Sequence, residues 1–76
     1  MNNDRRKTIA TAIELLEQAQ SLLEPIQEEE NDAFEALSEN LQASEKGEAI
    51  GTAASNLQDA IDSIESALSS LEEARQ

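Results

Sequence analysis

The sequence predicts an all-α protein, an antiparallel hairpin of two long helices that associates into a four-helix bundle or a larger helical oligomer. Three observations support this prediction. Apolar residues recur every three or four positions through both halves of the 76-residue chain. A short polar stretch separates the halves, which gives one domain over residues 1–76 with a helix near 4–37, a turn near 38–44 and a helix near 45–75. The chain has no cysteine, and so small a core usually needs help from self-association.

The second half carries the clearest pattern. Large aliphatic residues alternate there at steps of four and three, the spacing of a helix in a coiled coil. They are Leu57, Ile61, Ile64, Leu68 and Leu71. An alanine also recurs every seven residues beside them, at Ala53, Ala60, Ala67 and Ala74. A line of such small residues lets a second backbone approach closely.

The first half has a broader apolar face. Its members are Ile9, Ile13, Leu16, Leu23, Ile26, Ala33, Phe34 and Leu37, with Ala12, Ala19, Leu15 and Leu22 widening the stripe. This face is wider than one partner helix covers, which predicts a homo-oligomer whose contacts include Leu15, Leu22 and Ile26. Pro25 removes one backbone donor, so we expect a kink there. We do not expect a break, because the apolar pattern resumes in register beyond it.

The ends of the first helix lead to two further expectations. Asn3 or Asp4 has the short polar side chain that caps a helix start. The basic residues 5–7 are unfavourable for the dipole of their own helix. Antiparallel pairing would place them beside Glu72 and Glu73, which would offset that effect and set the orientation of the helices.

The turn can be interpreted residue by residue. Ser38 is expected to end the first helix, and Leu41 to plug the apolar end of the bundle. Ser44 can cap the second helix by accepting a hydrogen bond from an amide of its first turn. Gly47 lies one turn further on, where the missing side chain would allow the Phe34 ring or the facing backbone to come close.

The residues from Ala33 to Gly47 resemble a family of short phage and prophage proteins. The family pattern is AF, then a leucine, then an E-x-L-Q-x-S-E-(R or K)-G turn between two acidic helices. The residues that match it are Phe34, Leu37, Glu39, Leu41, Gln42, Ser44, Glu45, Lys46 and Gly47. Ser38, where proline is more usual, and the additional Pro25 depart from it. The resemblance implies a helical hairpin of phage origin and no known activity.

Three residues of the turn also have an alternative, functional interpretation. Gln42, Ser44 and Lys46 would form a contact point for a partner at the tip of the hairpin. The purely structural interpretation is that they only shape the turn.

The charge of the chain restricts its partners. Seventeen acids against five bases give a formal net charge of −12, which repels nucleic acid and anionic membranes and favours basic partners. No apolar run approaches the roughly 20 residues that cross a bilayer, and the N-terminus lacks the apolar stretch of a signal peptide. We therefore expect no direct nucleic-acid or membrane contact and a cytoplasmic protein, in the host cytoplasm if a phage encodes it.

The residue types argue against catalysis. The chain has no His, Cys, Tyr or Trp, so its hydroxyl groups lack a base that would activate them. We expect no enzyme activity and no cofactor. Some acids at helical spacing could hold a hard cation such as magnesium, namely Glu14 with Glu17, Glu24 with Glu28, and Asp59 with Asp62 and Glu65. A solvated helix face explains these pairs more simply, and we predict no metal site.

Residues 8–45 carry acids and no base, which suggests a rod that mimics the phosphates of a nucleic acid. We predict an inhibitor that blocks the basic, nucleic-acid-binding surface of a host or defence protein. The predicted contact residues are Glu24, Glu28, Glu29, Glu30, Asp32 and Glu35. One alternative is a structural, self-assembling bundle with a solubilising acidic coat. The other is an oligomeric sponge for a small nucleotide that pools Lys46 or residues 5–7, although bases are few and no aromatic ring is available for stacking.

Overall fold

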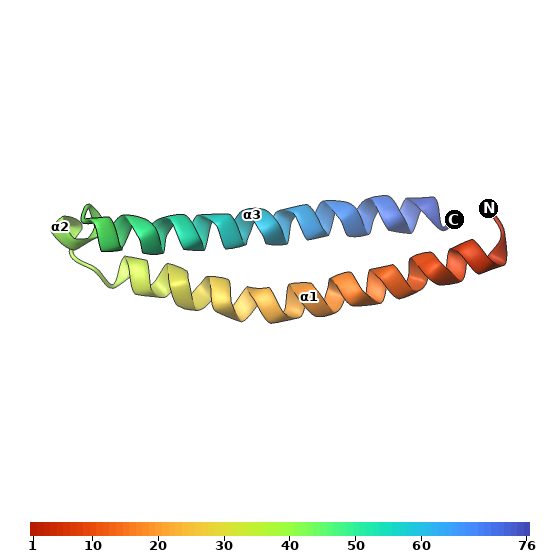
Figure 1. Ribbon diagram of the computed structural model, residues 1–76, viewed down its shortest axis with the longest axis horizontal. Coiled ribbons are helices and arrows are strands. Elements are labelled where there is room, and N and C mark those ends of the chain that lie inside the picture. Colours follow the sequence, from red (N-terminus) through yellow and green to blue (C-terminus); the bar gives the residue numbers. More distant parts are fainter.

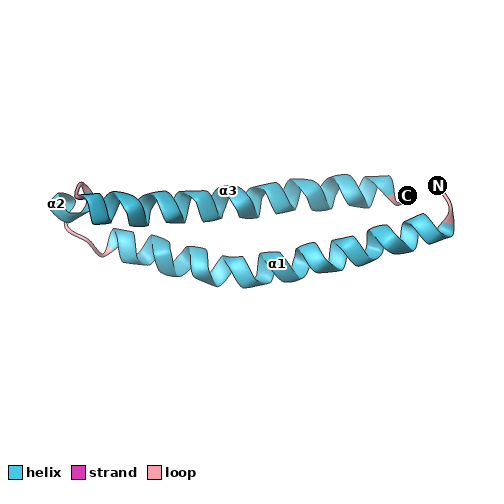
Figure 2. Cartoon of the chain, in the orientation of Figure 1, coloured by secondary structure: helices cyan, strands magenta, loops and turns pink.

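Two long helices lie side by side and run in opposite directions, so that both chain termini lie at one end (Figure 1). The computed structural model describes all residues from 1 to 76. Its elements are α1 (Asn3–Glu35), α2 (Glu39–Gln42) and α3 (Glu45–Ala74), with no strand (Figure 2). The molecule is a rod of 57 × 15 × 13 Å. The predicted antiparallel hairpin is confirmed, and α2 is an element that the sequence did not predict.

The helices meet along one narrow seam. Only Ile13 of α1 and Gly47, Ala54 and Ile61 of α3 are buried. The other predicted apolar residues of the α3 seam are half-buried: Leu57, Ile64, Leu68 and Leu71. No large side chain is fully enclosed. The hairpin therefore has a thin core, because two helices can cover only one side of each other.

The α1 side of this seam is partly polar. Gln20 and Gln27 occupy seam positions between apolar residues, and both are half-buried. Gln20 Nε2 donates a hydrogen bond of 3.3 Å to Oε1 of Glu65 on α3. Ile26 and Ala33, which the sequence placed on the packed side, are exposed instead. The single helix α3 covers only one seam of α1, so these residues have no neighbour in the hairpin.

The start of α1 differs slightly from the prediction. Asn2 is the cap, since its Oδ1 accepts the Arg5 N–H at 2.8 Å, so the assignment of the cap to Asn3 or Asp4 is wrong. Asn2 is the last residue with extended backbone angles before the helix. Further along, α1 continues unbroken through Pro25, as predicted. Figure 1 shows α1 bowing away from α3 near its middle.

The connection between the long helices is held by side chains that bond to backbone. Ser38 does not end α1, which ends at Glu35; it caps α2 by accepting the Leu41 N–H at 3.4 Å. Gln42 Nε2 donates to the carbonyls of Phe34 at 3.1 Å and Leu37 at 3.2 Å. These carbonyls lie at and just beyond the end of α1, where the regular bonds of the helix stop. Gln42 thus fastens the end of α1 to α2.

Ser44 caps α3, as predicted. Its Oγ accepts the Gly47 N–H at 3.2 Å and donates to the Leu41 carbonyl at 2.5 Å. Leu41 itself is 54% exposed, so the prediction that it plugs the end of the bundle is wrong. The extra helical turn of α2 directs this side chain to solvent.

Two glycines of α3 allow close contacts at this end of the rod. A Cβ on Gly47 would overlap the Leu41 carbonyl oxygen and lie 2.7 Å from the Gln42 carbonyl oxygen. The facing backbone therefore occupies the space at Gly47, which was one of the two predicted possibilities. The Phe34 ring packs one turn further along, against Gly51.

Arg6 connects the two long helices at the open end of the rod, where both chain termini lie. Its Nε donates to the Arg75 carbonyl at 3.1 Å and its Nη2 to the Gln76 carbonyl at 3.3 Å. Carbonyls at a helix C-terminus lack internal partners and carry partial negative charge, so they attract a guanidinium group. The predicted pairing of residues 5–7 with Glu72 and Glu73 does not form.

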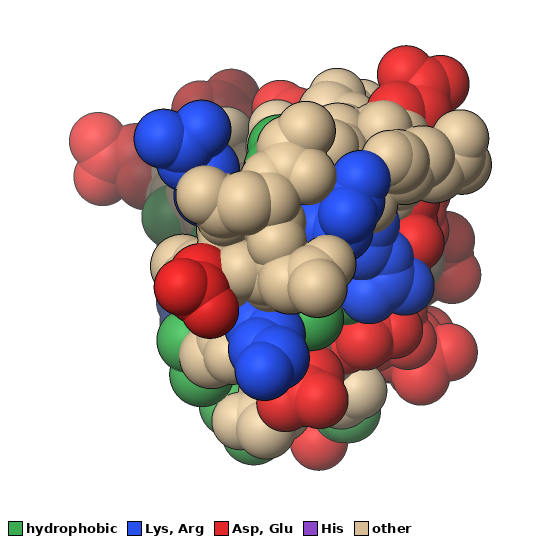
Figure 3. All heavy atoms as spheres, turned by 90° about the vertical axis from the view of Figure 1, so that its right-hand side faces the viewer, with side chains coloured by type: hydrophobic (Ala, Val, Ile, Leu, Met, Phe, Trp, Pro, Cys, Tyr) green, Lys and Arg blue, Asp and Glu red, His purple; other side chains and the backbone are tan.

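The only ion pair of the chain joins Glu72, in the last turn of α3, to Arg75, the residue that follows this helix, at 2.8 Å. Figure 3 looks onto this end of the rod and shows its Lys and Arg side chains gathered there.

None of the three helices combines the length and the apolar character that crossing a membrane requires.

Candidate protein-binding site

Acidic residues form a row on one side of the α1 seam. Their positions differ by three, four or seven residues, so they share one side of the helix. The row consists of Glu14, Glu17, Glu24, Glu28 and Glu35, all of them exposed. The seam of α1 thus has a continuous line of carboxylates along one edge.

A corresponding row borders the seam of α3. It consists of Gln58, Asp62, Glu65, Ser69 and Glu72. A groove of about 290 Å³ joins the two rows, lined by Glu24, Gln27 and Glu28 of α1 and by Gln58, Ile61 and Glu65 of α3. Both rows therefore lie on the same side of the hairpin. We call the carboxylates of the two rows the acidic face: Glu14, Glu17, Glu24, Glu28, Glu35, Asp62, Glu65 and Glu72.

The structure separates the six acids that the sequence grouped as a contact surface. Three of them belong to the acidic face, namely Glu24, Glu28 and Glu35. Asp32 is exposed beside this row, further from α3. Glu29 lies on the other side of the seam, and Glu30 lies in the seam position itself and is half-buried. A run of consecutive acids winds around a helix, so it cannot form one surface.

Five acids of the acidic face were missing from that predicted group: Glu14, Glu17, Asp62, Glu65 and Glu72. Three or four residues separate each of them from a neighbour in its row. This spacing, measured from the apolar seam of each helix, is the sequence signal that would have identified them. The contribution of α3 became clear only when the groove placed Glu65 next to Glu24 and Glu28.

The acidic face carries almost no compensating charge. Glu72 has the only cationic partner, Arg75. Three other carboxylates accept hydrogen bonds from neutral side-chain amides. Gln20 donates to Glu65, Gln58 donates to Asp62 at 3.0 Å, and Asn31 donates to Glu35 at 3.3 Å. These bonds orient the carboxylates but leave their negative charge intact. The face thus presents a strong negative potential to an approaching partner.

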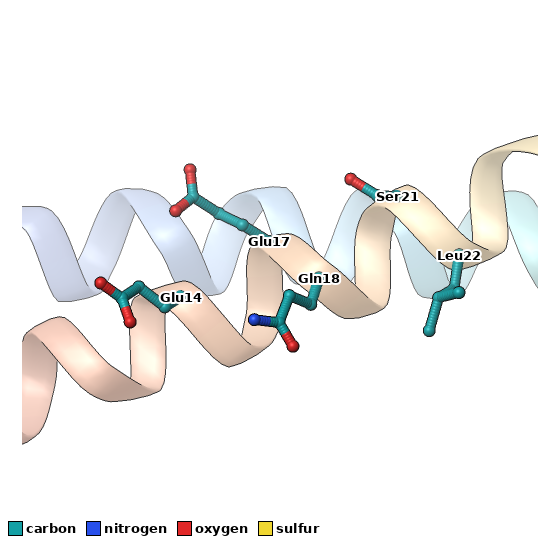
Figure 4. A pocket seen from close by; sticks show the side chains of 5 residues that line it. All are labelled: Glu14, Glu17, Gln18, Ser21 and Leu22. Carbon is teal, nitrogen blue, oxygen red and sulfur yellow. The ribbon is translucent and has the colours of Figure 1, made fainter.

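The acids do not gather into a metal site. No three carboxylates of the chain come close enough together to hold a metal ion. The acids that the sequence suggested for magnesium therefore form no such group with their neighbours. The largest surface depression, of about 570 Å³, is lined by five residues of α1 alone, so it lies on the outside of one helix (Figure 4).

The opposite side of the seam is mainly apolar. On α1 it carries Thr8, Ala12, Leu15, Ala19, Leu22, Ile26, Glu29 and Ala33, and on α3 it carries Ala49, Ala53, Asn56, Ala60, Ser63, Ala67, Ser70 and Ala74. We call these two rows the apolar face. The acidic rows share one side of the hairpin, so these rows share the other. Figure 4 shows Leu22 pointing away from Glu17 and Ser21.

Large side chains on the apolar face are strongly exposed. Leu15 is 61% exposed, Leu22 is 71% exposed and Ile26 is 48% exposed. In Figure 3, hydrophobic side chains show along the lower left of the rod. The hairpin is therefore two-sided, with carboxylates on one side and leucines opposed by small residues on the other.

The turn residues proposed as a contact point have unequal roles. Gln42 and Ser44 use their polar groups inside the turn. Lys46 is exposed and forms no ion pair. It lies at the opposite end of the rod from residues 5–7, so one subunit does not bring its bases together for an anionic nucleotide (Figure 1).

No protein-family model matches the chain, and no curated protein or solved structure matches it. The similarity of residues 33–47 to the phage proteins therefore stays a prediction.

Proposed function

We propose that this protein is a non-enzymatic binding protein whose acidic face docks on a basic, nucleic-acid-binding surface of another protein and blocks it. The observation that carries this proposal is the acidic face: one side of the rod holds eight carboxylates, of which only Glu72 has a cationic partner. Such a surface attracts basic partners over several ångströms and repels nucleic acid.

The spacing of the carboxylates supports mimicry of a nucleic acid. The α1 row spans 21 residues, or about 32 Å of helix, and the α3 acids lie alongside the same stretch. Together they supply about one negative charge per 4 Å, close to the interval of about 3.4 Å between the phosphates of one DNA strand. A basic groove that binds a nucleic-acid strand would therefore meet a similar charge density.

The turn supports a role in phage counter-defence. Its similarity to phage proteins suggests a phage gene product that acts in the cytoplasm of a bacterial host. Nucleic-acid-binding defence proteins offer the basic surfaces that this proposal requires. A small acidic protein bound there would act stoichiometrically, by competition.

We propose to test this function with isosteric charge removal. The test variant combines Glu24→Gln, Glu28→Gln and Glu65→Gln, which surround the groove. The control variant combines Glu48→Gln, Asp59→Asn and Glu73→Gln, which are exposed acids outside the acidic face. Both variants lose three charges, so a difference between them reports position and not net charge.

Each protein would be immobilised and exposed to bacterial host lysate at low and high salt. We expect the parent and the control variant to retain the same basic protein, which high salt or added duplex DNA releases. The test variant should retain little of it. If both variants retain it equally, or if DNA and the hairpin bind it together, the acidic face is not the binding surface.

We also propose that the hairpin works as a homo-oligomer. Only 4 of its 76 residues are buried, and three large aliphatic side chains of α1 are about half exposed or more. So thin a core gives little net stability, and contact with further helices would enlarge it.

A further inference from the structure

We infer that the apolar face is the contact surface for a second copy of this chain, and that the two copies lie antiparallel about a two-fold axis through the middle of the rod. This inference rests on the self-association proposed above and adds its surface and its geometry. α1 packs on α1 of the partner copy and α3 on α3, which completes a four-helix bundle.

The exposed area fits such a dimer. A compact monomer of 8.3 kDa exposes about 4,600 Å². The hairpin exposes 5479 Å². The excess is similar to the roughly 800 Å² that each partner hides in an interface of standard size.

The α1 row of the apolar face and the four heptad alanines of α3 are centred at nearly the same level of the rod. The α1 row runs from Thr8 to Ala33, so its midpoint lies between Gln20 and Ser21. The four heptad alanines of α3, Ala53, Ala60, Ala67 and Ala74, have their midpoint between residues 63 and 64. The hydrogen bond from Gln20 to Glu65 shows that these two midpoints lie at the same level of the rod. One two-fold axis at that level therefore relates the α1 row and the heptad alanines of α3 to their copies.

The same axis pairs mainly apolar residues with one another on α1 and small residues with one another on α3. On α1 it sets Leu15 opposite Ile26 of the partner copy, Leu22 opposite Ala19 of the partner copy, and Glu29 opposite Ala12 of the partner copy. On α3 all the heptad alanines face one another, in the pairs Ala53 with Ala74 and Ala60 with Ala67 of the partner copy. Small residues there allow the α3 helices to approach closely, while the leucines fill the space between the α1 helices.

Charge favours this antiparallel orientation. Arg5 and Lys7 are exposed at the open end and form no ion pair within the chain. The axis sets them level with the region of Asp32 and Glu35 in the partner copy. A parallel dimer would instead bring the two acidic turn ends together, which like-charge repulsion opposes.

The antiparallel dimer also leaves the acidic faces free. They lie on the two outer sides of the bundle, back to back, because each points away from its own apolar face. One dimer therefore offers two identical acidic surfaces.

The first measurement is the mass of the parent protein by light scattering across micromolar concentrations. A dimer mass is expected. A monomer would overturn both the self-association and its geometry, whereas a trimer or larger assembly would overturn the two-fold geometry alone.

The orientation is tested by disulfide cross-linking, since the chain has no cysteine of its own. Ser63→Cys lies beside the proposed axis, where two copies of the residue come within disulfide range. Ser69→Cys is the matched control on the acidic side of α3. We expect mild oxidation to cross-link Ser63→Cys and to leave Ser69→Cys monomeric on denaturing gels. Failure of Ser63→Cys to cross-link in a protein of dimer mass would overturn the antiparallel geometry while leaving self-association intact.

The surface is tested by Leu22→Gln, with Leu41→Gln as its control. Both leucines are exposed, but Leu41 lies in α2, outside the apolar face. Leu22→Gln should shift the mass to that of a monomer, and Leu41→Gln should stay dimeric. A dimeric Leu22→Gln protein would show that another surface joins the copies.

Discussion

The Phe34 ring lies against Gly51, so closely that a Cβ added to this glycine would be 2.9 Å from Cε1 of the ring. This contact joins the last turn of α1 to the second turn of α3. Gly47, one turn earlier, meets backbone atoms of Leu41 and Gln42 instead. The two glycines therefore have different neighbours: a side chain that can tilt and a backbone that cannot move without opening the turn.

We predict that Gly47→Ala destabilises the hairpin far more than Gly51→Ala does. A methyl group at Gly47 forces the turn backbone apart, which should lower the free energy of unfolding by about 2 kcal/mol or more. At Gly51 the ring must tilt, but alanine is also the better helix former by about 1 kcal/mol, so the net change should be small. Urea unfolding followed by circular dichroism measures both. Equal midpoints would contradict the packing at Gly47.

Ile61→Ala is predicted to cost about 2 to 4 kcal/mol of unfolding free energy, because Ile61 is 5% exposed and lies at the middle of the seam. Ile64→Ala should cost less, since Ile64 is only half-buried. Leu41→Ala, at an exposed position, should have the same melting temperature as the parent protein. Thermal melts of the three variants would reveal this order, and a melt of Ile61→Ala at the parental temperature would show that the seam is assigned wrongly.

Removal of a helix cap gives a third test. Ser44→Ala should lower the free energy of unfolding by about 1 kcal/mol, because the Gly47 N–H loses its acceptor. Ser38→Ala should have a smaller effect, since its bond is longer, at 3.4 Å, and caps a helix of four residues. Chemical unfolding of both variants checks the ranking, which an equal loss in the two would refute.

Pro25→Ala is predicted to stabilise the protein. Pro25 is exposed inside α1 and makes one fewer backbone bond there, which in a helix interior costs up to about 3 kcal/mol. Alanine restores the donor without removing a buried contact. The melting temperature should rise, with Ser21→Ala as a control on the same helix. A fall would mean that the curvature at Pro25 is needed for packing.

Salt should act in opposite directions on folding and on partner binding. With a net charge of −12, the hairpin repels itself, and added salt screens that repulsion over distances beyond about 10 Å at 0.1 M. The melting temperature of the free protein should therefore rise with salt, while capture of a basic partner weakens. A melting temperature that falls with salt would indicate that ion pairs, and not apolar contacts, hold the helices together.

The sequence was sufficient for features that depend on periodicity. The seam through Ile61 and the cap at Ser44 follow from spacing and from local side-chain chemistry, and both are present. The helix α2 was missed because a single helical turn has no period. It depends on Gln42 reaching two carbonyls at the end of α1, a contact between segments that spacing alone does not show.

The candidate site was predicted only in part, for a similar reason. Glu28, Glu29 and Glu30 are adjacent in the sequence and were grouped together, but successive residues of a helix point in different directions. Glu65 lies beside Glu28 only because α3 packs against α1 in one particular register. Arg6 likewise bonds to carbonyls near residue 76, a partner that no count of charges can reveal.

The bond between Arg6 and the carbonyl of Gln76 holds the two chain ends together at one end of the rod (Figure 1). A reporter protein fused to either terminus would therefore project from the same end of the rod. That end lies far from the turn and beyond the span of the acidic face. A short linker between the ends should close the chain into a ring. A new break in the α2 connection would then give a circular permutant, in which α3 precedes α1 and the same seam forms between them.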